Sequence, residues 1–158
     1  MTKLTLAKYE ENAHSTIAAS TQEHLDVAFN PELVGLLRRY VEICKTIDVY
    51  KKACFYGRDI ESYPTPLKPL NRNGIDSGVI HGVLGIAGEA GEVVELLLEA
   101  IDTGTIPEKF SEELGDVLWY IAVGARAAGS SLEEVGRGNN TKLQDRWAAK
   151  QGANDFKS

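Results

Sequence analysis

Apolar residues recur every three or four positions along most of this sequence. Between residues 80 and 101 the steps alternate between four and three, at Ile80, Leu84, Ala87, Gly91, Val94, Leu98 and Ile101. This spacing places them on one side of an α-helix, where they can pack against a neighbouring helix. Asp76 or Ser77 can cap the N-terminus and Gly104 can end the helix, so we expect it to span about 77–104.

The same criteria predict further helices. Asn30, Pro31 and Glu32 supply an N-cap, a proline at the first helical position and an acidic first turn. Ser131 and Glu134 have the spacing of a capping box. The further predicted helices are 4 to about 19, 31 to about 57, one that starts near Pro107 or Ser111 and stops at Gly129, and 131–147. No segment alternates like a strand. We therefore predict an all-α fold, a helical bundle with a four-helix core.

One of these helices contains the stretch DVLWYIAVGA, which is apolar nearly all round. Such a helix is typical of the buried centre of a bundle. Prolines at 64, 66 and 69 and a glycine at 74 predict a loop over 58–76. Its unusual length suggests a binding loop or lid. With 158 residues, the chain is expected to form a single domain, 1–158.

Composition and charge exclude several classes of protein. The chain is 43% hydrophobic and has no apolar run near the roughly 20 residues of a membrane span. Glu10 and Glu11 come too early for a signal peptide. Cys44 and Cys54 form no CxxC pattern, so we expect reduced cysteines in a cytoplasmic protein. The net charge of −6 argues against a nucleic-acid partner, and no membrane partner is expected.

A row of glutamates raises the question of a metal site. Glu89, Glu92, Glu95 and Glu99 lie three or four residues apart in the segment GIAGEAGEVVELLLEA. One interpretation is an ordinary solvated helix face. However, no Lys or Arg occurs between Arg72 and Lys109, so these like charges repel one another without a local partner. Small residues flank Glu89 and Glu92, which would let another helix approach closely.

A second acid pair, Glu113 and Asp116, precedes the apolar run of the next predicted helix. A carboxylate that enters a core needs a cation or strong hydrogen bonds. Two helices that each present an acid pair at i,i+3 can converge four carboxylates on one point. Oxygen ligands of this kind select Mg²⁺ or Mn²⁺, and the lack of a nearby His or Cys argues against zinc.

The segments LGIAGEAGEVVE and EELGDVLWYIAV resemble the paired motifs of the MazG-like, all-α nucleoside triphosphate pyrophosphohydrolases. The tail resembles the same family at Asn139, Lys142-Leu143 and Arg146, so the resemblance covers about 79–147, after N-terminal helices and a proline-rich loop in 1–78. It implies that Mg²⁺ is held by the catalytic carboxylates of Glu89, Glu92, Glu113 and Asp116. It also implies hydrolysis of a nucleoside or deoxynucleoside triphosphate to the monophosphate and pyrophosphate, by a homodimer or homotetramer.

The resemblance further implies roles in binding the nucleotide. Lys142 and Arg146 would contact the phosphates, with Asn139 beside them, and Tyr120 would lie near the nucleotide. Some relatives carry a glutamate just before the first motif as a proposed base, where this chain has Gly88. Glu95 or a water held by the metal are alternatives for that base. Further candidates for contact with the substrate are His81, Lys51, Lys52 and Arg58.

Two alternative functions remain open on the sequence. The first is a related phosphoribosyl-ATP pyrophosphohydrolase. The second is a catalytically silent helical module, stabilised by a metal, that acts in regulation or interaction with another protein. Pyrophosphate release distinguishes either enzyme from the silent module.

Overall fold

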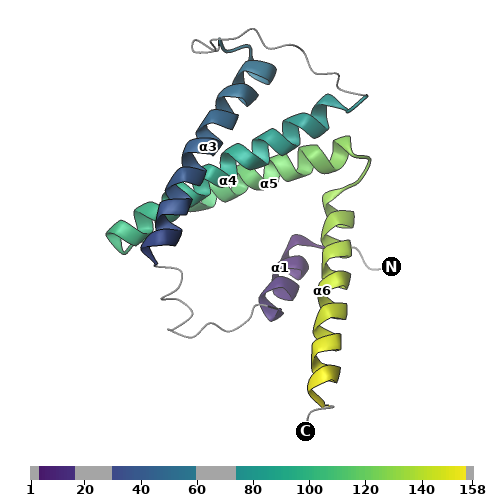
Figure 1. Ribbon diagram of the computed structural model, residues 1–158. Helices are drawn as coiled ribbons and strands as arrows, with labels where there is room; N and C mark the ends of the chain where they lie inside the picture. Colours follow the sequence, from purple (N-terminus) through teal and green to yellow (C-terminus); the bar gives the residue numbers. More distant parts are fainter. Residues whose placement is uncertain (1–3, 17–29, 60–73, 156–158) are drawn as a thin grey trace. The chain divides into compact units, whose positions relative to one another are not determined.

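The computed structural model of the protein describes residues 4–16, 30–59 and 74–155 (Figure 1). In this part of the chain all regular structure is helical, which confirms the predicted all-α class. The helices are α1 (Leu6–Ser15), α3 (Pro31–Tyr56), α4 (Ser77–Thr103), α5 (Phe110–Ala127) and α6 (Leu132–Asp155). None of the described helices is long and apolar enough to cross a membrane.

Local capping sets most of the helix ends where the sequence predicts them. The Asn30 side chain accepts a hydrogen bond from the Glu32 N–H at 2.8 Å, and Asp76 accepts one from Gly78 at 2.7 Å. At the C-termini of α3 and α4, Gly57 and Gly104 adopt the left-handed conformation with φ of 64° and 74°. Glycine enters this conformation without the steric cost that a Cβ imposes, which explains these ends.

Two predicted helix ends are wrong. The first helix ends at Ser15 rather than near Ala19, and the backbone N–H of Thr16 donates to the carbonyl oxygen of Ala13 at 3.1 Å in a tightened last turn. The last helix continues to Asp155 rather than ending at Trp147. Its capping box is confirmed, since Ser131 N–H donates to Glu134 at 2.8 Å and Glu134 N–H donates to Ser131 Oγ at 3.2 Å. Most of the predicted 58–76 loop lies outside the described residues.

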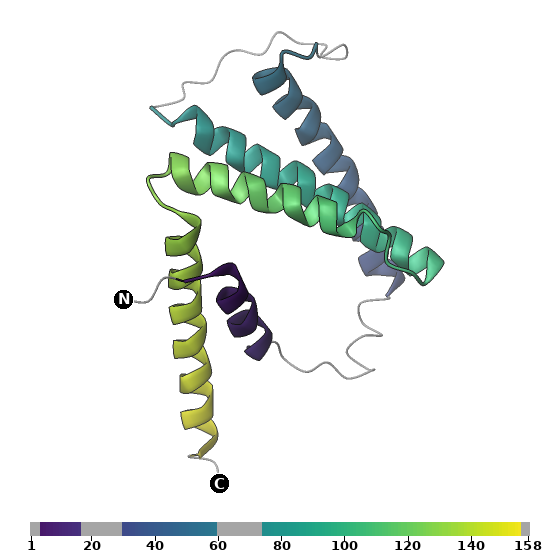
Figure 2. The same ribbon diagram turned by 180° about the vertical axis from the view of Figure 1, so that it is seen from behind.

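Residues 22–129 form one compact unit, whose described helices α3, α4 and α5 run alternately up and down. Helix α4 lies in the middle and contacts both neighbours, as the two opposite views show (Figures 1 and 2). Gly78 of α4 lies beside Ala127 of α5, and Gly85 lies beside Tyr120, so these two helices are antiparallel. Helix α3 crosses the other side of α4, with Lys45 against Glu95 and Lys51 against Glu89.

Glycines allow both neighbours to approach α4 closely. A Cβ built on Gly82 would lie 2.6 Å from the Gly124 Cα of α5. On the side facing α3, a Cβ on Gly91 would lie 2.2 Å from the Cys44 Cβ. The expected close approach at small residues is therefore confirmed. Of the predicted apolar stripe, Gly91 and Leu98 are buried and the other members are half-buried. Both cysteines are free, with Cys44 buried and Cys54 exposed.

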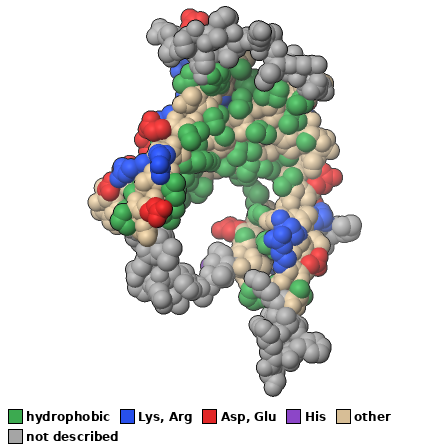
Figure 3. All heavy atoms as spheres, viewed as in Figure 1, with side chains coloured by type: hydrophobic (Ala, Val, Ile, Leu, Met, Phe, Trp, Pro, Cys, Tyr) green, Lys and Arg blue, Asp and Glu red, His purple; other side chains and the backbone are tan. Residues whose placement is uncertain are grey.

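Helix α5 differs from its prediction. We expected its apolar run to be buried all round, but Tyr120 is the one buried residue of this helix. Trp119 is 53% exposed, and Leu114 and Leu118 are 47% and 43% exposed. The physical reason is that α5 is an outer helix of this unit and packs against α4 along one side. Figure 3 shows the apolar side chains gathered over the face of these helices.

Residues 1–21 and 130–158 form a second compact unit, in which α1 packs against α6. Gly136 of α6 makes room for α1, since a Cβ there would lie 3.2 Å from Leu4 and 3.3 Å from Tyr9. Asn139 donates a hydrogen bond to the Tyr9 hydroxyl at 2.9 Å. The prediction of a single domain over 1–158 stays a prediction, as does the four-helix core.

Candidate metal centre

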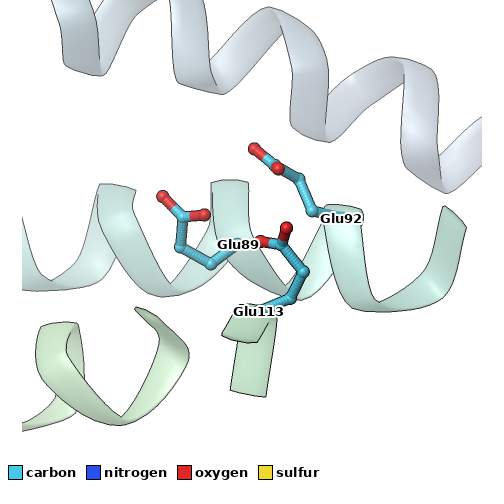
Figure 4. Close-up of side chains that lie close together, drawn as sticks. All are labelled: Glu89, Glu92 and Glu113. Atoms are coloured by element: carbon cyan, nitrogen blue, oxygen red, sulfur yellow. The ribbon is translucent and has the colours of Figure 1, made fainter. Parts of the chain in front are cut away.

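Three carboxylates converge in the unit formed by α3, α4 and α5. Glu89 and Glu92 stand one turn apart on α4, and Glu113 lies in the first turns of α5. Each offers an oxygen within 4.8 Å of the other two. Figure 4 shows the three side chains close together, with Glu89 and Glu92 on one helix and Glu113 on the other. The sequence therefore predicted three residues that the fold brings together.

The other acids of the predicted row behave differently. Glu95 and Glu99 are exposed on α4, as a solvated helix face requires, whereas Glu89 is buried and Glu92 is half-buried. Glu95 pairs with Lys45 of α3 at 2.8 Å. The row is thus divided: Glu89 and Glu92 lie within the packed helices, and Glu95 and Glu99 are exposed to water.

Asp116 is an exposed residue of α5, one turn after Glu113. It is not one of the three carboxylates whose oxygens lie within 4.8 Å of each other. Its charge nevertheless reaches Glu113, because repulsion from Asp116 contributes to the raised pKa of that residue. Its role as a fourth ligand stays a prediction.

The electrostatics of the cluster favour a cation. Burial raises the pKa of Glu92 above its ordinary value, and repulsion from Glu89 and Glu113 raises it further. The pKa of Glu113 is raised for the same reasons, first burial and then repulsion from Asp116 and Glu89. Carboxylates held this close together repel one another and destabilise the folded protein. A hard divalent cation bound between them would remove that repulsion. The donor set, which is oxygen only, fits Mg²⁺ or Mn²⁺.

Helix α3 adds two residues to the cluster. Lys51 is 2% exposed, and its ammonium lies 2.6 Å from Glu89 Oε1 and 2.8 Å from Asp48 Oδ1. Burial alone would lower the pKa of Lys51, but the ion pairs with Asp48 and Glu89 outweigh burial and raise it. The same lysines, Lys51 and Lys52, lower the pKa of Asp48 against the effect of its burial. Lys52 also forms an ion pair with Asp48.

Asp48 was missed in the sequence analysis. It lies three residues before Lys51 and four before Lys52, so a helix places all three on one side. That spacing was the available signal, but it did not reveal that this side of α3 faces Glu89.

Aromatic residues form a second cluster beside Lys51. The Lys51 ammonium lies 4.7 Å from the centre of the Tyr120 ring, and the Tyr120 hydroxyl is 3.1 Å from that of Tyr56. His81 stacks on Phe55 with ring centres 4.1 Å apart and lies edge-on to Tyr120. Burial and the hydrogen bond with Tyr56 raise the pKa of Tyr120 to about 12. The fold thus brings the predicted Tyr120 and His81 together, with Phe55 and Tyr56, which the sequence analysis missed.

A groove runs between α3 and α4 next to the carboxylates, with a volume of about 290 Å³. Its cationic lining comes from Lys45 and Lys52, and its acidic lining includes Asp48, Glu92 and Glu95. Arg58, another predicted contact, is exposed just beyond the end of α3.

The predicted tail residues belong to the unit formed by α1 and α6. Lys142 and Arg146 are exposed one turn apart on α6, where they line a surface hollow with Arg137 and Asp145. Asn139 is half-buried, and its amide is already engaged by Tyr9. Their contact with a nucleotide stays a prediction.

A carboxylate cluster on antiparallel helices could hold a divalent metal ion, and the comparison with family models indicates the class of protein to which it belongs. Residues 82–149 match the model of the MazG nucleotide pyrophosphohydrolase domain. The resemblance to the MazG-like family is thereby confirmed over a segment that contains Glu89, Glu92, Glu113 and Asp116. The match covers less than half of the chain and indicates nucleotide pyrophosphohydrolase chemistry in general. Comparisons with curated proteins and with solved structures find no match.

Proposed function

We propose that the protein is a Mg²⁺-dependent nucleoside triphosphate pyrophosphohydrolase. It converts a nucleoside or deoxynucleoside triphosphate to the monophosphate and pyrophosphate, in control or cleansing of the nucleotide pool. The observation that carries this proposal is the convergence of Glu89, Glu92 and Glu113 inside the segment that matches the MazG domain.

All four predicted carboxylates would take part in binding the metal. Glu89, Glu92 and Glu113 would bind it, and Asp116 would join them from the next turn of α5. When bound, Mg²⁺ neutralises phosphate charge and activates water for attack on phosphorus. Mn²⁺ would serve the same donors. Because two packed helices hold these carboxylates, the helix backbones already place them close together before the cation binds.

The substrate would lie across the groove and the aromatic cluster. Lys45 and Lys52 line the groove beside Glu92 and can attract phosphate oxygens. Tyr120 is buried with Lys51 over its ring, so a base would lie near Tyr120 but contact the half-buried rings of His81 and Phe55. Among the side chains of the protein, Glu95 remains the candidate for the general base that activates the attacking water. Lys142 and Arg146 are proposed as additional phosphate contacts, with Asn139 beside them.

We also propose that the active form is a homodimer or homotetramer with a four-helix core. Helix α5 exposes the apolar side chains of Leu114, Leu118 and Trp119, and Leu114 and Leu118 lie one turn apart on the same side of the helix. A second copy that packs its own α4 and α5 there would bury them and complete a bundle of four helices.

The mass of the protein in solution tests this assembly. We expect the unmodified chain to have at least twice the monomer mass of 17.2 kDa at micromolar concentration, and Leu118→Glu to shift it toward the monomer. Leu36→Glu is the control, because Leu36 is also 50% exposed but lies on α3. Light scattering after gel filtration measures the mass. A monomeric, active wild-type protein would contradict the proposal.

The activity is tested by pyrophosphate release from a panel of canonical and modified triphosphates and phosphoribosyl-ATP, with Mg²⁺ and with EDTA. We expect release that requires metal, with the panel ranking the substrates. Release from phosphoribosyl-ATP alone would favour the related enzyme. No release from any substrate, while metal still raises the melting temperature, would leave the carboxylates as a structural metal site in a silent interaction module.

A further inference from the structure

Lys51 is a buried cation within the candidate metal centre. Its ammonium contacts Glu89, the most buried of the three converging carboxylates, at 2.6 Å. On its other side it contacts Asp48 at 2.8 Å, and the Tyr120 ring closes the site 4.7 Å from the ammonium. An unpaired buried ammonium would destabilise the folded protein, so the Lys51 ammonium stays beside these partners.

The two acidic partners differ in what else they face. Glu89 belongs to the converging trio on α4 and α5, whereas Asp48 lies on α3 with Lys51 itself. Asp48 also pairs with Lys52, and it is not a member of the trio. Lys51 therefore pairs with Glu89, which a metal would bind, and with Asp48, which could still pair with Lys51 after the metal has bound.

We propose that Lys51 acts as a built-in competitor of the divalent metal, pairing with Glu89 in the metal-free protein and relying on Asp48 when the metal takes Glu89. This inference rests on the proposed metal-dependent function. It makes Lys51 a positioning residue that holds the empty centre together and lowers its metal affinity.

Charge compensation is the physical basis of this competition. Without metal, the positive charge of Lys51 offsets the buried charge of Glu89, with which it forms an ion pair at 2.6 Å. With metal bound to the same carboxylate, two cations are brought close together and repel each other. A lysine at this position thus stabilises the metal-free state relative to the metal-bound state. The phosphates of a nucleotide would offset the surplus positive charge.

The test compares metal binding by Lys51→Met, Lys51→Arg and Lys45→Met, using Mn²⁺ or Mg²⁺ without nucleotide. Lys45 is the matched control because it also lies on α3 and pairs with a glutamate of α4, but it is 52% exposed. Calorimetric titration gives the affinity, and thermal unfolding with EDTA gives the stability of the metal-free protein.

We expect Lys51→Met to unfold at a lower temperature in EDTA and to bind metal on the order of tenfold more tightly. Lys51→Arg keeps the charge and should retain nearly the wild-type affinity. Lys45→Met should change the affinity by less than about threefold, because an exposed pair is screened by water and salt. If Lys51→Met does not fold without metal, Lys51→Gln carries the same comparison with a polar, uncharged side chain.

The outcomes separate this inference from the proposed function. Equal metal affinity in the wild type and Lys51→Met, or weaker binding by the variant, would overturn the competitor role and leave the metal centre intact. Failure of the wild type and of every variant to bind metal would overturn the centre itself, and the proposed function with it.

Discussion

Glu92→Gln is expected to reduce metal-dependent pyrophosphate release strongly. Glu92 is one of the three carboxylates whose oxygens lie within 4.8 Å of each other, and glutamine keeps its size while removing the charge that attracts the cation. We expect turnover to fall by about 10² to 10³, the range observed when one electrostatic stabiliser of a transition state is removed. Pyrophosphate release with saturating Mg²⁺ measures the loss.

Glu99→Gln is the matched control for this substitution. It makes the same chemical change on the same helix, but Glu99 is exposed and is not part of the converging trio. Its activity should remain near that of the wild type. Equal losses in both variants would show that charge on α4 in general, rather than the cluster, supports the activity.

Glu92→Gln should also be more stable than the wild type in EDTA at neutral pH. The pKa of Glu92 is raised by burial and by repulsion from Glu89 and Glu113, so its charged form destabilises the folded state. The advantage of the variant should shrink as the pH falls through that raised pKa, because the wild-type carboxyl then takes up a proton and loses the penalty. Melting temperatures measured over the acidic range test the sign.

Gly82→Ala is expected to separate α4 from α5 and to disrupt the metal centre from a distance. The added Cβ would lie 2.6 Å from the Gly124 Cα and 2.7 Å from its nitrogen, and neither backbone atom can turn aside as a side chain would. Overpacking of this kind costs about 1–3 kcal/mol of the free energy of unfolding. The displacement of α5 would also carry Glu113 away from Glu89 and Glu92, which should weaken metal binding.

Gly35→Ala is expected to have the opposite effect on the free energy of unfolding. Gly35 lies within α3, and a Cβ there meets no atom within 4 Å. Because alanine loses less backbone entropy in a helix than glycine, this variant should be more stable by about 0.5–1 kcal/mol. Urea unfolding followed by circular dichroism gives both values. A Gly82→Ala protein as stable as Gly35→Ala would contradict the close approach of the two helices.

Most helix boundaries could be predicted from the sequence because they depend on neighbours within one turn. Asn30 and Asp76 cap α3 and α4 through the amide two residues ahead, and Gly57 and Gly104 end them with a conformation that glycine adopts freely. The i,i+3 spacing of Glu89 and Glu92 likewise ensures that a helix presents both on one side. These interactions are local, so they can be predicted from the sequence without knowing which helices pack together.

Only the tertiary structure decided which of these sides face one another. The convergence of Glu113 with Glu89 and Glu92 depends on the antiparallel packing of α5 against α4. The burial of Lys51 between Asp48 and Glu89 depends on which side of α3 packs against α4. The apolar run of α5 predicted a buried central helix wrongly, because hydrophobicity along a helix does not tell how many other helices pack around it.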